Sequence, residues 1–187
     1  ERVQADALRS TIHWSLGEQE QCWELRQRSL DLARRLGDPA ALANAMSGFI
    51  SPGAPLQLLA EQVRAAEEFQ DVPRAGGRPS VFAAALFNRG EVLLNAGRRP
   101  EAEATWRELD AHAERVGDPY VRVWQTGAAV IRAGLEGELE RAVEIAQSFG
   151  AAAGTLGIDV TGRLVGIWFS AGPLLRLGRF EEVLAQR

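Results

Sequence analysis

A chain of 187 residues with 46% hydrophobic residues is long enough to bury a continuous core, which excludes an intrinsically disordered protein. Its 25 acidic and 21 basic residues are spread along the whole chain, so the net charge of −4 forms no basic stripe for direct binding of nucleic acid. Every basic residue is an arginine, and the absence of lysine excludes a Walker-type phosphate-binding lysine, a Schiff-base lysine and a lysine general base.

The sequence predicts neither a membrane span nor an export signal within these residues. No apolar stretch approaches the roughly 20 residues that cross a bilayer, and the charged first residues do not resemble a signal peptide. The single cysteine, Cys22, cannot form an intramolecular disulfide and is expected to be a small core residue. These features predict a cytoplasmic protein. Because no initiating methionine is present and residues 180–187 read as an unfinished amphipathic helix, both ends are expected to be cuts within a longer polypeptide.

Glycines divide the chain in two interleaved series. One series falls at residues 37, 77, 117 and 157, forty residues apart, and the other at residues 17, 97, 137 and 178. Glycine ends a helix readily because it adopts the left-handed conformation. The dipeptides Asp38-Pro39 and Asp118-Pro119 follow two of these glycines and supply an N-cap and a first-turn proline for the next helix. The positions of these glycines and Asp-Pro dipeptides therefore predict one helix about every twenty residues.

Between these glycines the apolar residues recur at helical spacing, and no segment alternates with the period of a strand. We therefore predict an all-α chain with first-type (A) helices near residues 2–16, 39–50, 80–96, 119–135 and 158–177. Second-type (B) helices are expected near 18–36, 55–71, 100–116 and 138–155, with a further one from 179. They form antiparallel pairs in a single domain over 1–187, with the pairs at 2–36, 39–71, 80–116, 119–155 and 158–187.

Residues 86–102 strongly resemble one tetratricopeptide repeat, with Gly90 and Ala102 at its small positions and Phe87 at an aromatic one. With the forty-residue period and the phrase Leu-Ala-Arg-Arg-Leu-Gly-Asp-Pro-Ala at 32–40, the chain is similar to the helical-repeat regions of large bacterial regulators. These include MalT-like and LuxR-type transcription activators and ATPase-linked adenylate or guanylate cyclases. The resemblance implies a right-handed superhelical solenoid that acts as a sensor or protein-interaction arm. ATPase, cyclase and DNA-binding parts would lie outside this fragment.

The second pair departs from that repeat. Residues 51–55 lack the consensus turn, and Gln62 stands near the place where the repeat has a small residue. We expect the helices of this pair to pack differently from the others.

Catalytic and metal-binding constellations are not evident in the sequence. The two histidines, His13 and His112, lie far apart, with no carboxylate or cysteine at metal-ligand spacing beside them. Neither Cys22 nor any serine stands in a nucleophile-elbow context. The glycine-rich run at 149–157 follows no strand, so it predicts close helix packing and a helix end rather than a phosphate loop. We predict no enzyme, with no catalytic residue, cofactor or metal.

Three of the five tryptophans lie on predicted A helices, which line the inner groove of tetratricopeptide solenoids. Tryptophan in a helical repeat either fills the core or, when exposed in the groove, anchors a ligand, and both roles stay open for them. Carrying the repeat pattern from the third pair onto the others gives a mixed aromatic and polar groove without the dense basic clamp that would favour a carboxylate-terminated peptide. Its candidate residues are Gln4, Thr11, Trp14, Phe87, Glu91, Asn95, Trp124, Trp168 and Arg176.

These features support three hypotheses about function. The first is a protein or peptide interaction arm of a signalling or transcription regulator, whose partner can be another domain of the same chain. The second is a small-molecule sensor with its ligand inside the superhelix, which an enclosed apolar cavity near Trp124 and Trp168 would favour. The third is a self-association module that forms homo-oligomers, because an open solenoid end exposes a helix face.

Overall fold

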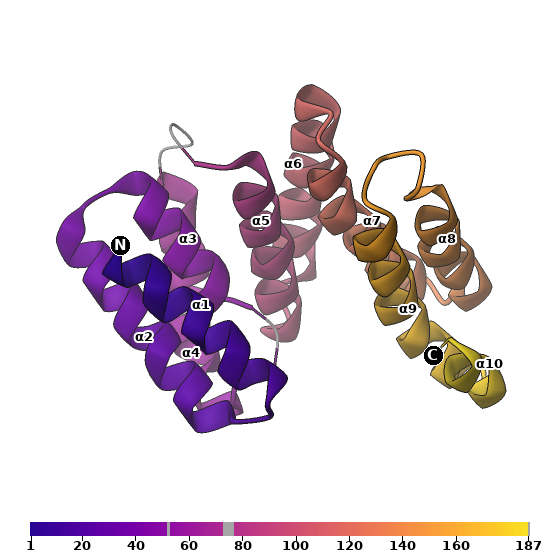
Figure 1. Ribbon diagram of the computed structural model, residues 1–187, viewed down its shortest axis with the longest axis horizontal. Helices are drawn as coiled ribbons and strands as arrows, with labels where there is room; N and C mark the ends of the chain where they lie inside the picture. The colour runs from indigo at the N-terminus through magenta and orange to yellow at the C-terminus, as the bar shows by residue number, and fades with distance from the viewer. Residues whose placement is uncertain (52, 73–76, 187) are drawn as a thin grey trace. The chain divides into compact units, whose positions relative to one another are not determined.

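The computed structural model describes residues 1–51, 53–72 and 77–186. In these ranges the chain is all-helical and contains no strand (Figure 1). It folds as two compact units, Glu1–Leu109 and Asp110–Arg187.

The first unit is a layered set of helices in which α1 packs against α2 and α3, and α5 packs against α3 and α4. Its helices are α1 (Arg2–Ser15), α2 (Gln19–Leu36), α3 (Pro39–Phe49), α4 (Leu59–Glu68), α5 (Pro79–Asn95) and the first part of α6 (Arg99–Val116). Short 3-10 turns, η1 (Leu56–Leu58) and η2 (Phe69–Asp71), flank α4.

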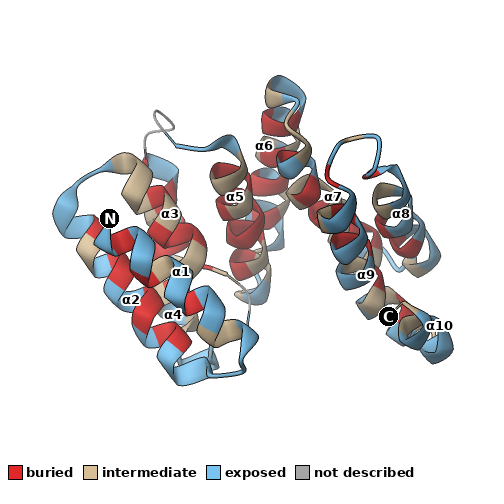
Figure 2. Ribbon diagram, viewed as in Figure 1, coloured by how far each residue is buried: buried red, intermediate tan, exposed pale blue. Residues whose placement is uncertain are grey.

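The second unit contains the end of α6 followed by α7 (Pro119–Leu135), α8 (Leu139–Ala152), α9 (Asp159–Arg176) and α10 (Phe180–Ala185). Helix α8 packs against both α7 and α9, and α10 packs against α9. Its core is made of small and branched apolar side chains, among them Val130, Ala142 and Ala146. In each unit the buried residues lie on the helix faces that meet, whereas α10 has no buried residue (Figure 2).

Outside the second pair, the helix boundaries predicted from the glycine series are confirmed to within a few residues. Gly37 and Gly117 end α2 and α6 with φ angles of 67° and 69°, in the left-handed region that favours glycine. The carboxylate of Asp38 accepts a hydrogen bond from the backbone N–H of Ala41 at 2.7 Å, and Asp118 accepts one from that of Tyr120 at 2.8 Å. Both aspartates therefore cap the next helix, as predicted.

The second pair differs from the single helix predicted over 55–71. That segment is divided into η1, α4 and η2, and the α-helical part begins only at Leu59. Gln62 is buried, and its side-chain amide donates to the backbone carbonyls of Phe49 and Ser51 at 2.8 and 3.0 Å. These bonds satisfy carbonyls at the end of α3 that a small residue would leave without a donor.

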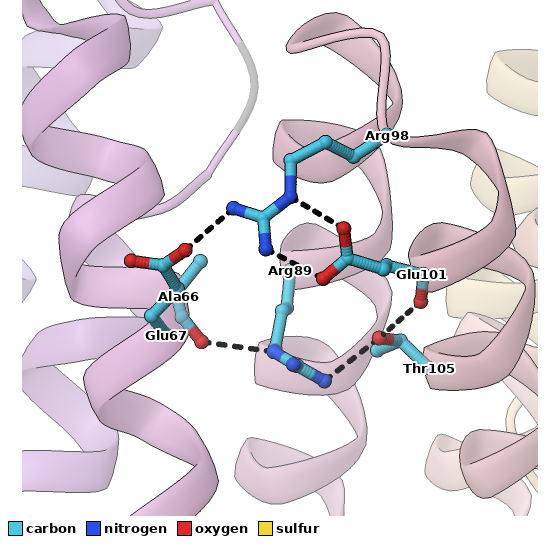
Figure 3. A network of polar contacts seen from close by, with 6 residues as sticks. All are labelled: Ala66, Glu67, Arg89, Arg98, Glu101 and Thr105. Atoms are coloured by element: carbon cyan, nitrogen blue, oxygen red, sulfur yellow. Dashed lines mark hydrogen bonds and ion pairs between the residues drawn. The ribbon is translucent and has the colours of Figure 1, made fainter.

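A buried arginine joins α4, α5 and α6. Arg89 donates from Nε to the carbonyl of Ala66 at 2.8 Å and from Nη1 to the hydroxyl of Thr105 at 2.7 Å (Figure 3). Above it, Arg98 forms ion pairs with Glu67 and Glu101. The network links α4, α5 and α6 within the first unit.

Candidate functional site

A hollow on the first unit lies between α1, α2 and α3 and is a candidate ligand site. Its volume is about 210 Å³. Helix α1 contributes Gln4 and Thr11, which are seven residues apart and so lie on one helix face. Helix α3 contributes Asn44, Ser47 and Gly48. The small residues on this face leave room between the helices, and the hollow is named here the α1–α3 pocket.

Several polar groups of the α1–α3 pocket already have partners within their own helices. Ser10 donates to the carbonyl of Ala7 at 2.7 Å, and Thr11 donates to the same carbonyl at 3.2 Å. The side-chain amides of Gln4 and Asn44 make no hydrogen bond to another residue in the described part of the chain. These two amides are therefore available to a ligand.

Arg26 of α2 lines the α1–α3 pocket and is 9% exposed. Its guanidinium carbon lies 4.4 Å from the ring centroid of Trp23 and 5.3 Å from that of Trp14, both within cation–π range. Its Nη1 donates to the hydroxyl of Ser51 at 2.6 Å, whereas Nε is buried without a hydrogen-bond partner.

The charge of Arg26 is not neutralised by a carboxylate in the described part of the chain. Loss of solvation on burial lowers the pKa of the Arg26 guanidinium, but arginine stays protonated in proteins. Asp6 on α1 is engaged elsewhere, because Arg28 donates to both of its carboxylate oxygens at 2.6 and 2.8 Å. A second arginine of the lining, Arg78, adds to the positive charge, and none of the described lining residues is acidic.

The structure brings together two of the predicted groove residues, Gln4 and Thr11, in this pocket. Trp14 stands behind it, because its ring lies between Arg26 and Gly53, where a Cβ on the glycine would be 2.3 Å from the ring. Trp14 therefore supports the wall of the pocket and does not form its surface.

The groove residues predicted on α5 do not form an open wall. Phe87 is buried with 3% exposure, and its carbonyl accepts a hydrogen bond from Trp106 at 3.2 Å. Glu91 was expected to be an exposed polar contact, but its Oε2 is buried without a hydrogen-bond partner. Loss of solvation raises the pKa of Glu91 to about 7. Of the three groove residues predicted on α5, only Asn95 is exposed.

The remaining predicted residues belong to the second unit and have different environments. Trp124 packs against the core cluster that includes Val123 and Ile158, so its role is mainly structural. Trp168 is 65% exposed, and its ring is stacked on that of Phe169 with centroids 6.0 Å apart. Arg176 is exposed near the end of α9.

Helix α9 also carries an apolar stripe on the surface of the second unit. The side chains of Val160, Leu164 and Trp168 are four residues apart and all more than half exposed. This stripe is an exposed apolar helix face of the second unit.

The part of the chain that the structure describes contains no group of three or more His, Cys, Asp or Glu side chains that could hold a metal ion. No described helix is both long enough and apolar enough to span a bilayer. Cys22 is fully buried, as predicted, and burial raises the pKa of its thiol. Comparison with protein-family models and with curated proteins yields no match in either case.

Sequence reasoning missed the residues that give the α1–α3 pocket its chemistry, although signals for them exist. Asn44 lies forty residues after Gln4, and Ser47 lies forty residues before Phe87, so the repeat register that selected the other groove residues also reaches α3. Arg26 follows Cys22 by four residues and precedes Leu30 by four, which places a charge within the buried stripe of α2. A charged residue in such a stripe is expected to be buried together with a specific interaction partner.

Proposed function

We propose that the first unit is a peptide-binding module that docks a segment of a partner protein over α1 and α3, with one partner side chain in the α1–α3 pocket. The observation that carries this proposal is the polar lining, where the amides of Gln4 and Asn44 and the guanidinium of Arg26 have unused donors. The volume of about 210 Å³ is smaller than the roughly 300–1,000 Å³ of clefts that enclose small molecules. It suits a side chain better than a whole effector molecule.

We infer further that the chain is a tetratricopeptide-like solenoid segment and serves as an interaction arm of a bacterial signalling or transcription regulator. The resemblance of residues 86–102 to one repeat supports this assignment. It is also supported by the regular starts of alternate helices, forty residues apart, at Pro39, Pro79, Pro119 and Asp159. In such arms the A helices present the binding face, and α1 and α3 are A helices in this register.

The proposal is tested by selecting ligands from a random-peptide phage library on the purified chain and measuring their affinity by fluorescence anisotropy. A pocket-filling variant, Gly48→Leu, tells whether the selected peptides use the pocket. Gly48 lines the pocket, and a Cβ built on it meets no atom within 4 Å, so the first atom of the new side chain has room and the leucine is expected to fill pocket space. We expect Gly48→Leu to weaken binding by at least about tenfold, the loss typical of blocking a binding hot spot.

Gly172→Leu is the matched control. Gly172 is also a helical glycine with no atom within 4 Å of a built Cβ, but it lies on α9 of the second unit. Peptides that bind both variants as tightly as the unmodified chain would contradict the proposal, and so would a selection that yields no peptide binding above a scrambled sequence.

A further inference from the structure

The α1–α3 pocket contains a cation, Arg26, that has no carboxylate partner among the described residues. Arg26 is 9% exposed, and its guanidinium has five N–H donors, of which one is used in the single hydrogen bond to Ser51. Burying a charge without an ionic partner is costly, because low-dielectric surroundings do not replace its hydration. The faces of Trp14 and Trp23 offset only part of this cost.

We propose that the α1–α3 pocket recognises a carboxylate, the side chain of a glutamate or aspartate in an acidic partner peptide, and that Arg26 supplies the charge that binds it. This inference rests on the proposed function and names the chemistry of the side chain that enters the pocket. The carboxylate becomes the counter-ion that no described residue provides. The free amides of Gln4 and Asn44 add neutral donors from α1 and α3.

The arrangement favours a carboxylate over a phosphate group. A carboxylate is planar and accepts hydrogen bonds on two oxygens, which matches the edge of one guanidinium and a small number of amides. A phosphate has three terminal oxygens and a larger charge, and its sites usually combine several cations or backbone N–H groups. Here Arg26 is already held by Ser51 on one nitrogen, and the second lining cation, Arg78, is exposed.

The experiment uses the whole chain labelled with ¹⁵N and three short probes: acetyl-Ala-Glu-Ala-amide, its glutamine counterpart and its phosphoserine counterpart. NMR titration follows the side-chain N–H signal of Arg26 and the indole signals of Trp14 and Trp23. We expect saturable shifts at all three residues with the glutamate probe and at least about tenfold weaker binding of the glutamine probe, because a charge-assisted hydrogen bond is lost. The ligand-side replacement leaves the fold untouched.

Protein variants provide a second measurement. Arg26→Met should abolish discrimination between the glutamate and glutamine probes, and Arg78→Met should reduce it by a smaller factor. If Arg26→Met does not fold by circular dichroism, the comparison of the two probes on the unmodified chain decides. Equal binding of both probes, tighter binding of the phosphoserine probe, or no saturable shift at Arg26 would overturn the inference. If phage-selected peptides are blocked by Gly48→Leu and yet lack acidic residues, the carboxylate assignment fails and the proposed function stands.

Discussion

The indole of Trp106 on α6 lies against the backbone of Gly90 on α5, so that a Cβ built on Gly90 would be 2.1 Å from Nε1 of the indole. The same Nε1 donates to the carbonyl of Phe87 at 3.2 Å, and Trp106 is fully buried. The large ring and the absent side chain are therefore complementary. This pair holds α5 and α6 at close distance in the first unit.

Gly90→Ala should destabilise the protein by roughly 1–3 kcal/mol, because the added methyl group forces the indole out of its place in the core. The free energy of unfolding in urea measures the effect. Gly134→Ala on α7 is the control, since a Cβ there meets no atom within 4 Å, and it should be neutral or stabilising by up to about 1 kcal/mol. Equal effects of the two substitutions would show that the contact between Gly90 and Trp106 does not determine the change in the free energy of unfolding.

A second close approach lies between α8 and α9. A Cβ on Gly162 would be 2.0 Å from the Cβ of Ala153, whereas a Cβ on Gly172 of the same helix meets no atom within 4 Å. We expect Gly162→Ala to lower the free energy of unfolding by roughly 1–3 kcal/mol, and Gly172→Ala to leave it unchanged or slightly raised. Thermal denaturation of the two variants gives this comparison within one helix. A melting temperature of Gly162→Ala equal to that of the unmodified chain would contradict the packing of α8 on α9.

The sequence predicts local structure well in this protein because its glycines and aspartate caps act through the backbone of neighbouring residues. Gly37, Asp38, Gly117 and Asp118 all end or begin helices where the pattern places them. The close helix packing predicted from the glycine-rich run at 149–157 is likewise present, since a Cβ on Gly150 would be 3.4 Å from the carbonyl oxygen of Gly162. Helix ends, caps and glycine-rich contacts of this kind can be predicted from the spacing of residues along the chain.

The candidate site is predicted only in part, because exposure depends on which helices cover a face. Phe87 and Glu91 occupy register positions that would face a groove, yet Phe87 is buried and a carboxylate oxygen of Glu91 is inaccessible to solvent. Arg26 was missed because its helix was not expected to contribute to a binding surface. It belongs to a second-type helix, but two tryptophans draw its guanidinium into the wall of the pocket. Neither effect is encoded in local sequence spacing.

Arg89→Ala should destabilise the first unit, because it removes the donors for the carbonyl of Ala66 and the hydroxyl of Thr105 in a buried position. Unsatisfied buried acceptors and the lost packing together should cost roughly 1–3 kcal/mol in urea denaturation. Arg107→Ala on the exposed side of α6 serves as control and should change the free energy of unfolding by less than about 0.5 kcal/mol. If both variants unfold alike, the network of Figure 3 contributes little to stability.

The buried carboxyl group of Glu91 should make stability depend on pH. Loss of solvation raises its pKa from 4.5 to about 7 in the folded chain, so between these values the folded state retains a proton that the unfolded state has lost. The free energy of unfolding should therefore fall by up to about 1.4 kcal/mol per pH unit over this window, to a total of about 3 kcal/mol above it. Glu91→Gln removes this titration, so the variant should match the unmodified chain near pH 5 and be more stable at pH 8.

Urea denaturation at both pH values measures the difference, with Glu144→Gln on the exposed side of α8 as the control that should follow the unmodified chain. A constant difference between Glu91→Gln and the unmodified chain at the two pH values would show that the carboxyl group is ionised in the folded protein throughout this range.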